Sequence, residues 1–170
     1  MSQEDASAEG FEGWYRREHP RLVACLAVSL GDLSLAQEAA DEAFVRALVR
    51  WEQVAHMEAP LAWTYTVAIN AGRRVRRRAG LERRLLGRRR EATVDIPAAS
   101  ADVWHAVLML PPRQRSAIGL FYLLDLATPD VARIMRIAPG TVAATLHAAR
   151  HRLAQLLGED PILTEANYFD

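Results

Sequence analysis

The chain has 170 residues, of which 51% are apolar, so it can bury one or two globular cores and does not have the composition of a disordered protein. Its formal net charge is zero, yet all 21 basic residues are arginine, and residues 73–90 hold ten of them against one acid, Glu82. This asymmetry predicts a basic band between two more acidic bodies. The single cysteine, Cys25, excludes an internal disulfide and a cysteine-rich zinc site.

The remaining composition favours an all-helical protein without metal or cofactor. Alanine and leucine are abundant and strand formers are sparse. Among the five histidines only His147 and His151 have ligand-like spacing, and no third ligand accompanies them. No segment reaches the ~20 apolar residues that span a bilayer. The polar, acidic N-terminus lacks the apolar run of a signal peptide. We therefore expect a cytoplasmic protein without membrane insertion.

The first part of the chain predicts two helices separated by a turn. Residues 1–10 are rich in Ser, Ala and Glu, and we expect them to be disordered. Apolar residues then recur at helical spacing over residues 11–30, with an irregularity expected at Pro20. Ser34, followed three residues later by Gln37, has the capping-box pattern for the start of the next helix.

This next helix has two contrasting faces. Its expected buried face comprises Leu35, Ala39, Phe44, Val45, Leu48 and Trp51. The opposite face carries Glu38, Asp41, Glu42 and Arg46. By default a charged helix face of this kind is simply solvated.

A loop over residues 53–60, containing His56 and Met57, leads into a helix over residues 61–78 that combines aromatic and cationic groups. Trp63, Thr64 and Tyr65 offer stacking and hydrogen-bonding groups that suit unpaired bases. An arginine block ends the helix, and guanidinium groups match the geometry of phosphate and stay charged at physiological pH. The segment indicates contact with nucleic acid. The alternative is a solvated helix end, because basic clusters have low specificity as a signal.

A linker is expected over residues 81–100, and the sequence after it predicts a second body of four helices. The apolar face of the first comprises Val103, Trp104, Val107, Leu108 and Leu110. The second is expected over residues 113–124, with Ile118, Phe121 and Tyr122 inward. The third begins near Thr128, a good N-cap followed by Pro129. A tight turn ending in Gly140 precedes the fourth, over residues 141–157.

The third and fourth of these helices predict a helix-turn-helix, in which the second helix enters the major groove of DNA. The alternative is an ordinary helical hairpin. Four segments, taken together, are more specific: residues 38–48, 62–78, 110–115 and 128–150, the last with Gly140-Thr141-Val142 and Ala149-Arg150 in register. In this order they resemble the extracytoplasmic-function sigma factors of bacterial RNA polymerase, over about residues 11–157.

The resemblance implies an all-α fold of two small helical domains joined by a flexible linker, the second domain containing the helix-turn-helix. Residues 11–80 would form the domain that docks on the polymerase clamp and opens the downstream promoter element. Residues 101–158 would form the domain that recognises the upstream element, and residues 159–170 a C-terminal tail. The implied partners are RNA polymerase core, promoter DNA and an anti-sigma factor.

The resemblance also implies three sets of site residues. The residues expected to bind polymerase are Glu38, Asp41, Glu42 and Arg46. The residues expected to bind the downstream element are His56, Met57, Trp63, Tyr65, Asn70, Arg73, Arg74, Arg76 and Arg77. The residues expected to bind the upstream element are Thr141, Ala144, Thr145, His147 and Arg150.

One departure from the family bears on the upstream element. The family usually has lysine or arginine where this chain has Ala143, Ala144, Thr145 and Ala148. Each lost cation weakens binding and flattens its salt dependence, so we expect the second domain alone to bind DNA weakly.

Two other functions remain open at this stage. The first is a helix-turn-helix regulator, or a sigma-like adaptor without full initiation activity. The second is an interaction-only protein held by an anti-sigma partner. An enzyme is not expected, because no nucleophile–base pair, carboxylate pair or phosphate loop is visible in the sequence.

Overall fold

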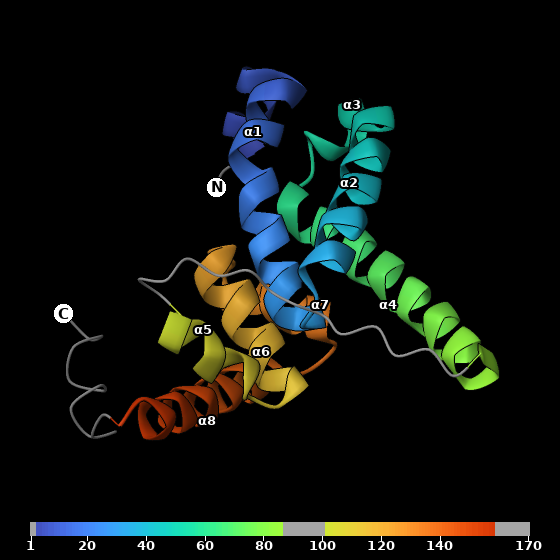
Figure 1. The fold of residues 1–170 in the computed structure, drawn as a ribbon. Helices are drawn as coiled ribbons and strands as arrows, with labels where there is room; N and C mark the ends of the chain where they lie inside the picture. Colours follow the sequence, from blue (N-terminus) through green and yellow to red (C-terminus); the bar gives the residue numbers. More distant parts are fainter. Residues whose placement is uncertain (1–2, 87–100, 159–170) are drawn as a thin grey trace. The chain divides into compact units, whose positions relative to one another are not determined.

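The structure, a computed structural model, describes residues 3–86 and 101–158 (Figure 1). The chain divides into two compact units, Met1–Val94 (unit 1) and Asp95–Asp170 (unit 2). Every regular element in the described ranges is a helix, which confirms the all-α class with two small helical bodies. Most of the expected linker and the whole expected tail lie outside the described residues.

Unit 1 is built from α1 (Gln3–Leu30), α2 (Leu33–Val49), α3 (Trp51–Val54) and α4 (Pro60–Leu86). Helices α1, α2 and α4 pack against one another. At one end of this bundle the fully buried Trp14 lies with its ring centroid 5.0 Å from the rings of both Phe44 and Trp51. Aromatic rings at such distances contribute packing beyond the area they bury.

Helix α1 differs from expectation at its start. It begins at Gln3, where we expected disorder through residue 10, because Ala and Glu in this stretch favour helix. Its break lies at Gly10, with φ of 72°, and not at Pro20, which lies inside the helix. Only glycine adopts this positive φ without strain from a side chain.

Helix α2 is capped and buried differently from the prediction. Asp32, not Ser34, is its N-cap, and the Asp32 carboxylate accepts a hydrogen bond of 2.9 Å from the Leu35 amide. Val45 and Leu48, which we expected in the core, are 61% and 53% exposed. The buried face keeps the predicted Ala39 and Phe44, and its other members are Ala36, Ala40, Ala43 and Ala47. Alanines let neighbouring helices approach closely, so the smallest side chains, not the largest, mark this interface.

Helix α4 is longer than predicted at its C-terminal end, running to Leu86 and so into the expected linker. It starts at Pro60, a residue suited to the first helical turn. At Gly72 it lies against the end of α1, where an added Cβ would come within 2.7 Å of Leu30 Cδ1. The missing side chain therefore allows this close approach.

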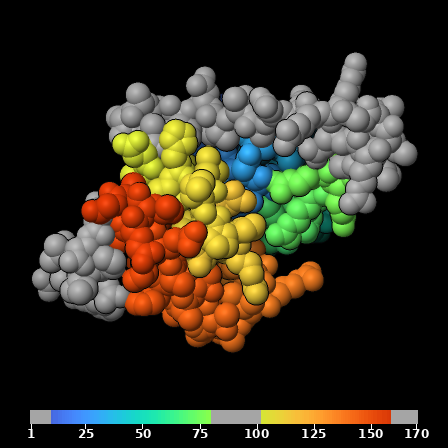
Figure 2. Space-filling view, turned by 60° about the horizontal axis from the view of Figure 1, so that its bottom comes forward, coloured from blue at the N-terminus to red at the C-terminus, as the bar shows by residue number. Residues whose placement is uncertain are grey.

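Unit 2 packs α5 (Ala101–Leu108), α6 (Pro112–Ile118) and α7 (Thr128–Met135) against α8 (Pro139–Leu157), and the π-helical η2 (Gly119–Leu123) contacts α6 and α7. Its core residues include Ala106, Val107, Leu110, Ala117, the predicted Ile118, Leu120, Val131, Val142, Leu146 and Ala149. Figure 2 shows part of the surface of this unit in yellow to red.

Several details of unit 2 correct the sequence prediction. Val103 and Tyr122 are 51% and 40% exposed, although both were expected to face inward. The π turn, closed by the Leu124 amide bonding to the Gly119 carbonyl at 3.2 Å, adds a residue to the helical repeat and so changes which side chains point inward. Ala127, without a side-chain bond, holds the N-cap position expected for Thr128.

Helices α7 and α8 form the expected helix-turn-helix. The left-handed residue between them is Arg136, with φ of 55°, and not the glycine we associated with the turn. Gly140 lies inside α8, with open space where its Cβ would be. Ala138 is the N-cap of α8 and provides no side-chain bond.

Candidate nucleic-acid and polymerase interfaces

One face of α4 carries a continuous exposed polar stripe. It consists of Thr66, Asn70, Arg73 and Arg77, whose spacing of four, three and four residues places them on one side of the helix. The half-buried Trp63 lies on the same side, one turn before Thr66. The stripe extends about 16 Å along the helix axis at 1.5 Å per residue. It offers amide and guanidinium donors in a single row, which suits an anionic strand.

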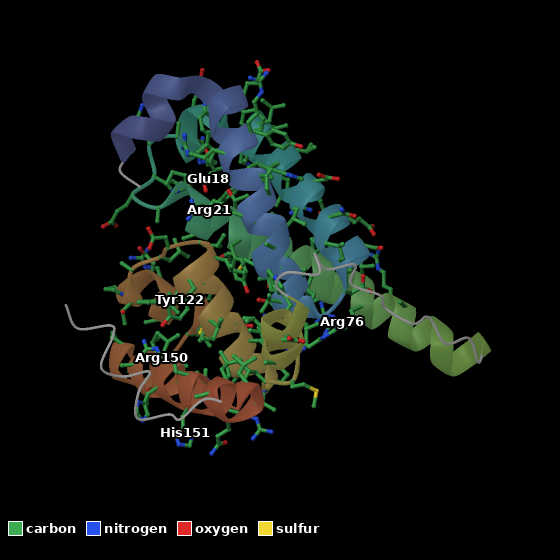
Figure 3. All side chains as sticks on the ribbon, turned by 60° about the vertical axis from the view of Figure 1, so that its left-hand side comes forward. Glu18, Arg21, Arg76, Tyr122, Arg150 and His151 are labelled. Atoms are coloured by element: carbon green, nitrogen blue, oxygen red, sulfur yellow. The ribbon has the colours of Figure 1, made fainter. Side chains whose placement is uncertain are left out.

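The other two arginines that were predicted to bind DNA, Arg74 and Arg76, are bonded within unit 1. Arg74 Nη2 lies 2.8 Å from the Glu42 carboxylate of α2, and Arg76 donates to the Leu30 carbonyl at the end of α1. Figure 3 labels Arg76. Arg73 and Arg77 are exposed, and no ion pair joins them to another described residue. The block that the sequence predicted as one phosphate-binding set is therefore two sets with different surroundings.

Tyr65 must be removed from the predicted DNA contacts. Its side chain is 2% exposed, and its hydroxyl lies 3.1 Å from Ser29 Oγ in the core. Thr64 beside it is fully buried and donates to the Pro60 carbonyl. Both residues belong to the packing face of α4, whereas the stripe lies on the opposite, exposed face.

His56 and Met57 lie in the turn between α3 and α4, at the same end of α4 as Trp63. His56 is exposed, and its Nδ1 lies 2.7 Å from the Glu52 carbonyl. Met57 is half-buried. The exposed His56 and the half-buried Met57 and Trp63 thus place imidazole, thioether and indole groups within eight residues at the start of α4.

The acidic face of α2 is only partly available to a partner. Asp41 pairs with His19 of α1 at 2.8 Å, and Glu42 pairs with both Arg46 and Arg74. Glu38 is exposed, and no ion pair joins it to another described residue. The same helix exposes Val45, Leu48 and Val49 towards its C-terminus. Glu38 is thus the acid on this face most open to a basic partner.

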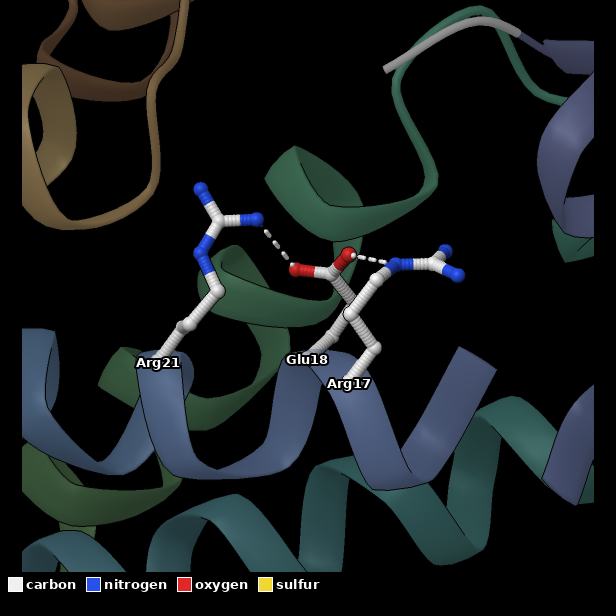
Figure 4. Close-up of polar contacts among 3 residues, drawn as sticks. All are labelled: Arg17, Glu18 and Arg21. Atoms are coloured by element: carbon white, nitrogen blue, oxygen red, sulfur yellow. Dashed lines mark hydrogen bonds and ion pairs between the residues drawn. The ribbon is translucent and has the colours of Figure 1, made fainter. Parts of the chain in front are cut away.

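Sequence analysis missed a buried carboxylate in α1 (Figure 4). Glu18 is fully buried, and its two oxygens lie 2.8 Å from Arg17 Nε and 2.8 Å from Arg21 Nη1. A buried carboxylate needs such charged partners to offset its lost hydration. Its spacing gave a signal, because Glu18 falls four residues from both Trp14 and Leu22, on the buried side of the helix.

On α8 the expected upstream-element residues are partly exposed. Thr141, Ala144 and His147 are exposed, whereas Thr145 is half-buried and donates to the Thr141 carbonyl at 2.7 Å. Arg150 Nε donates to the Tyr122 hydroxyl of η2 at 2.8 Å, and Figure 3 labels both residues. This bond joins the middle of α8 to η2.

Cys25 lies in the core of unit 1, where burial raises the pKa of its thiol above the ordinary value, while a bond from Ser29 acts in the opposite direction. A protonated, buried thiol is unreactive. In residues 3–86 and 101–158 no three His, Cys, Asp or Glu side chains are grouped to hold a metal. Among the described helices, none has the length and hydropathy to cross a membrane.

Comparison with known proteins adds independent findings. A family model for sigma-70 region 2 matches residues 14–82, and one for sigma-70 region 4 matches residues 100–153. The RNA polymerase sigma-E factor of Streptomyces antibioticus is 31% identical over 126 residues, which cover 72% of this chain and 70% of that protein. The ECF RNA polymerase sigma factor SigM of Mycobacterium tuberculosis is 29% identical over 154 residues, which cover 87% of this chain and 77% of that protein.

A similar structure is that of the sigma factor RpoE of Bartonella quintana, solved in complex with the anti-sigma factor NepR. It matches with a TM-score of 0.77 and 24% sequence identity, over 89% of this chain and 99% of that one. At this identity the likeness concerns the fold alone. The two matched regions fall one in each unit, and α4 with its stripe lies almost entirely in the first.

Proposed function

The chain belongs to the extracytoplasmic-function sigma factors of bacterial RNA polymerase, and from this premise we propose how its residues divide the work of transcription initiation. As a sigma factor it joins polymerase core and directs it to promoter DNA. The exposed stripe on α4 is the observation that carries the proposal. Residues 11–80 then form the domain that docks on polymerase and opens DNA, and residues 101–158 form the domain that binds the upstream element.

In unit 1 we assign the stripe to the strand that leaves the duplex. Arg73 and Arg77 bind its phosphates, and Asn70 and Thr66 face the same strand. We assign the capture of an unstacked base to His56, Met57 and Trp63, at the start of α4. Unstacking costs a few kcal/mol, which pocket and backbone contacts offset. The chemistry of RNA synthesis belongs to the polymerase, and sigma factors are typically not enzymes, so we assign this chain no catalytic residue and no cofactor.

In unit 2 the exposed face of α8 meets the upstream element through Thr141, Ala144 and His147. Ala143 and Ala148 are also exposed, so these two positions lack the cations that would hold phosphates there. We infer that unit 2 supplies groove contacts and register, while unit 1 and the polymerase supply most of the affinity. Arg150 acts through its bond to Tyr122, which holds α8 in place, and not as a base contact.

The protein would act in the cytoplasm, where polymerase and promoter DNA are found, with an anti-sigma factor as a further partner. The RpoE protein of Bartonella quintana was solved with such a factor, which supports this class of partner.

The decisive test is run-off transcription with purified core polymerase on genomic fragments. A sigma factor gives discrete transcripts that require the added chain. A plain helix-turn-helix regulator binds DNA without giving any, and an adaptor without initiation activity binds core without giving any. Either of the last two outcomes would replace the proposal.

Docking can be tested at Glu38, because this exposed acid can be changed without breaking an ion pair among the described residues. Glu38→Arg should weaken binding to core polymerase about tenfold, since like charges across an interface repel, and should leave the melting temperature nearly unchanged. The measurement is a titration of labelled chain with core polymerase. Ser34→Arg, an exposed site one turn earlier on α2, is the matched control. Equal affinity of the Glu38→Arg variant and wild type would remove Glu38 from the docking surface.

A further inference from the structure

Glu42 connects the two surfaces that the proposed function assigns to different partners. It lies on α2, beside the exposed Glu38 and Asp41, and its side chain is 34% exposed. Its Oε1 is paired with Arg74 Nη2 of α4 at 2.8 Å and also with Arg46 Nη2 of α2. One oxygen of the Glu42 carboxylate is therefore paired with an arginine of α2, the helix proposed to face polymerase, and with an arginine of α4, the helix proposed to face DNA.

Arg74 is close enough to the stripe to join it. It follows Arg73 directly and lies four residues after Asn70, at the border between the stripe and the α2 contact. Its side chain is 42% exposed, so it reaches solvent although its Nη2 is paired with Glu42. An exposed ion pair of this kind contributes little to stability and exchanges partners readily when a competing charge arrives.

We propose that in the free protein Glu42 holds Arg74 in an ion pair that competes with DNA phosphate, and that engagement of Glu42 by the polymerase releases Arg74 to the strand on α4. Binding of the two partners is thereby coupled: a basic polymerase group that takes Glu42 frees one cation for DNA, and a phosphate that takes Arg74 leaves Glu42 with Arg46 alone and so more open to the polymerase. By linkage the coupling is reciprocal. This inference rests on the proposed function, since it needs both partners.

The first test uses the full-length chain without polymerase and a fluorescent 20-nucleotide oligo-dT strand, because phosphate contacts do not depend on sequence. Glu42→Gln keeps the shape of the side chain and removes the charge that holds Arg74. We expect this variant to bind oligo-dT about fivefold more tightly. The slope of log affinity against log salt should steepen by about 0.7, the value for one further phosphate contact on a single strand.

The matched control is Asp41→Asn. It removes the same charge from the neighbouring position of α2, but its partner is His19 and not an arginine of α4. It should produce a smaller gain in affinity and no change in slope. The double variant Glu42→Gln/Arg74→Gln should lose the gain of Glu42→Gln. An equal response of the Glu42 and Asp41 variants, or a gain that survives loss of Arg74, would overturn the inference.

A second measurement separates this inference from the proposed function. Glu42→Gln should bind core polymerase less tightly than wild type while binding oligo-dT more tightly. If wild type binds core polymerase and supports transcription but Glu42→Gln shows no gain on oligo-dT, the coupling is wrong and the sigma assignment stands. If wild type binds neither core polymerase nor DNA, the proposed function itself fails.

Discussion

Trp14→Ala should destabilise unit 1 by about 3 to 5 kcal/mol, the usual cost of truncating a fully buried aromatic residue. Trp14 is 0% exposed and lies among the rings of Phe11, Phe44 and Trp51. Its removal leaves a cavity where α1, α2 and the short α3 meet. A loss of this size is a large share of a domain's ordinary stability of about 5 to 15 kcal/mol.

The measurement is urea unfolding followed by far-ultraviolet circular dichroism. Val49→Ala is the matched control, since Val49 is 80% exposed and its truncation should change stability by less than about 0.5 kcal/mol. Trp14→Phe adds a finer test. The Trp14 Nε1–H is buried without a hydrogen-bond partner among the described residues, so phenylalanine keeps a ring and removes an unsatisfied donor. If Trp14→Ala unfolds at the same urea concentration as wild type, the aromatic cluster does not hold unit 1 together.

Sequence patterns located the helices well but their faces less well. Local signals, namely prolines at helix starts and apolar residues at helical spacing, predicted the order of α4 to α8 and the helix-turn-helix. The buried face of α2 was predicted correctly at Ala39 and Phe44 but wrongly at Val45 and Leu48, because periodicity weights large apolar residues, whereas the tight contact with α1 and α4 uses mostly alanines. Tyr122 points outward because of the π turn at Gly119–Leu123, and no residue type in that segment predicts such a turn.

The charged residues show more clearly that a sequence pattern does not predict which side chains find partners in the fold. The four arginines predicted to bind DNA have the same chemistry in the sequence, and only the tertiary partners, Glu42 and the Leu30 carbonyl, distinguish Arg74 and Arg76 from Arg73 and Arg77. Tyr65 was a plausible stacking residue until Ser29, 36 positions away in the chain, proved to be its partner. Pairings over such separations are set by the packing of α1 against α4, which a local pattern does not encode.

This division of the arginine block leads to the prediction with the largest expected effect on function. The double variant Arg73→Gln/Arg77→Gln should lower the affinity of the reconstituted polymerase for promoter DNA about a hundredfold, or about tenfold for each lost contact. Both side chains are exposed, so the melting temperature should stay within a degree or two of wild type. The slope of log affinity against log salt should fall by about 0.7 to 0.9 per residue.

The measurement is an anisotropy titration of a labelled promoter fragment, taken from the run-off experiment, at several salt concentrations. Arg76→Gln is the control, because it removes a charge from the same block but from a side chain that donates to the end of α1. It should lower the melting temperature and leave the salt slope nearly unchanged. If Arg76→Gln instead changes the slope as much as Arg73→Gln, the four arginines act as one diffuse cationic surface, and the stripe has no special part in binding the strand.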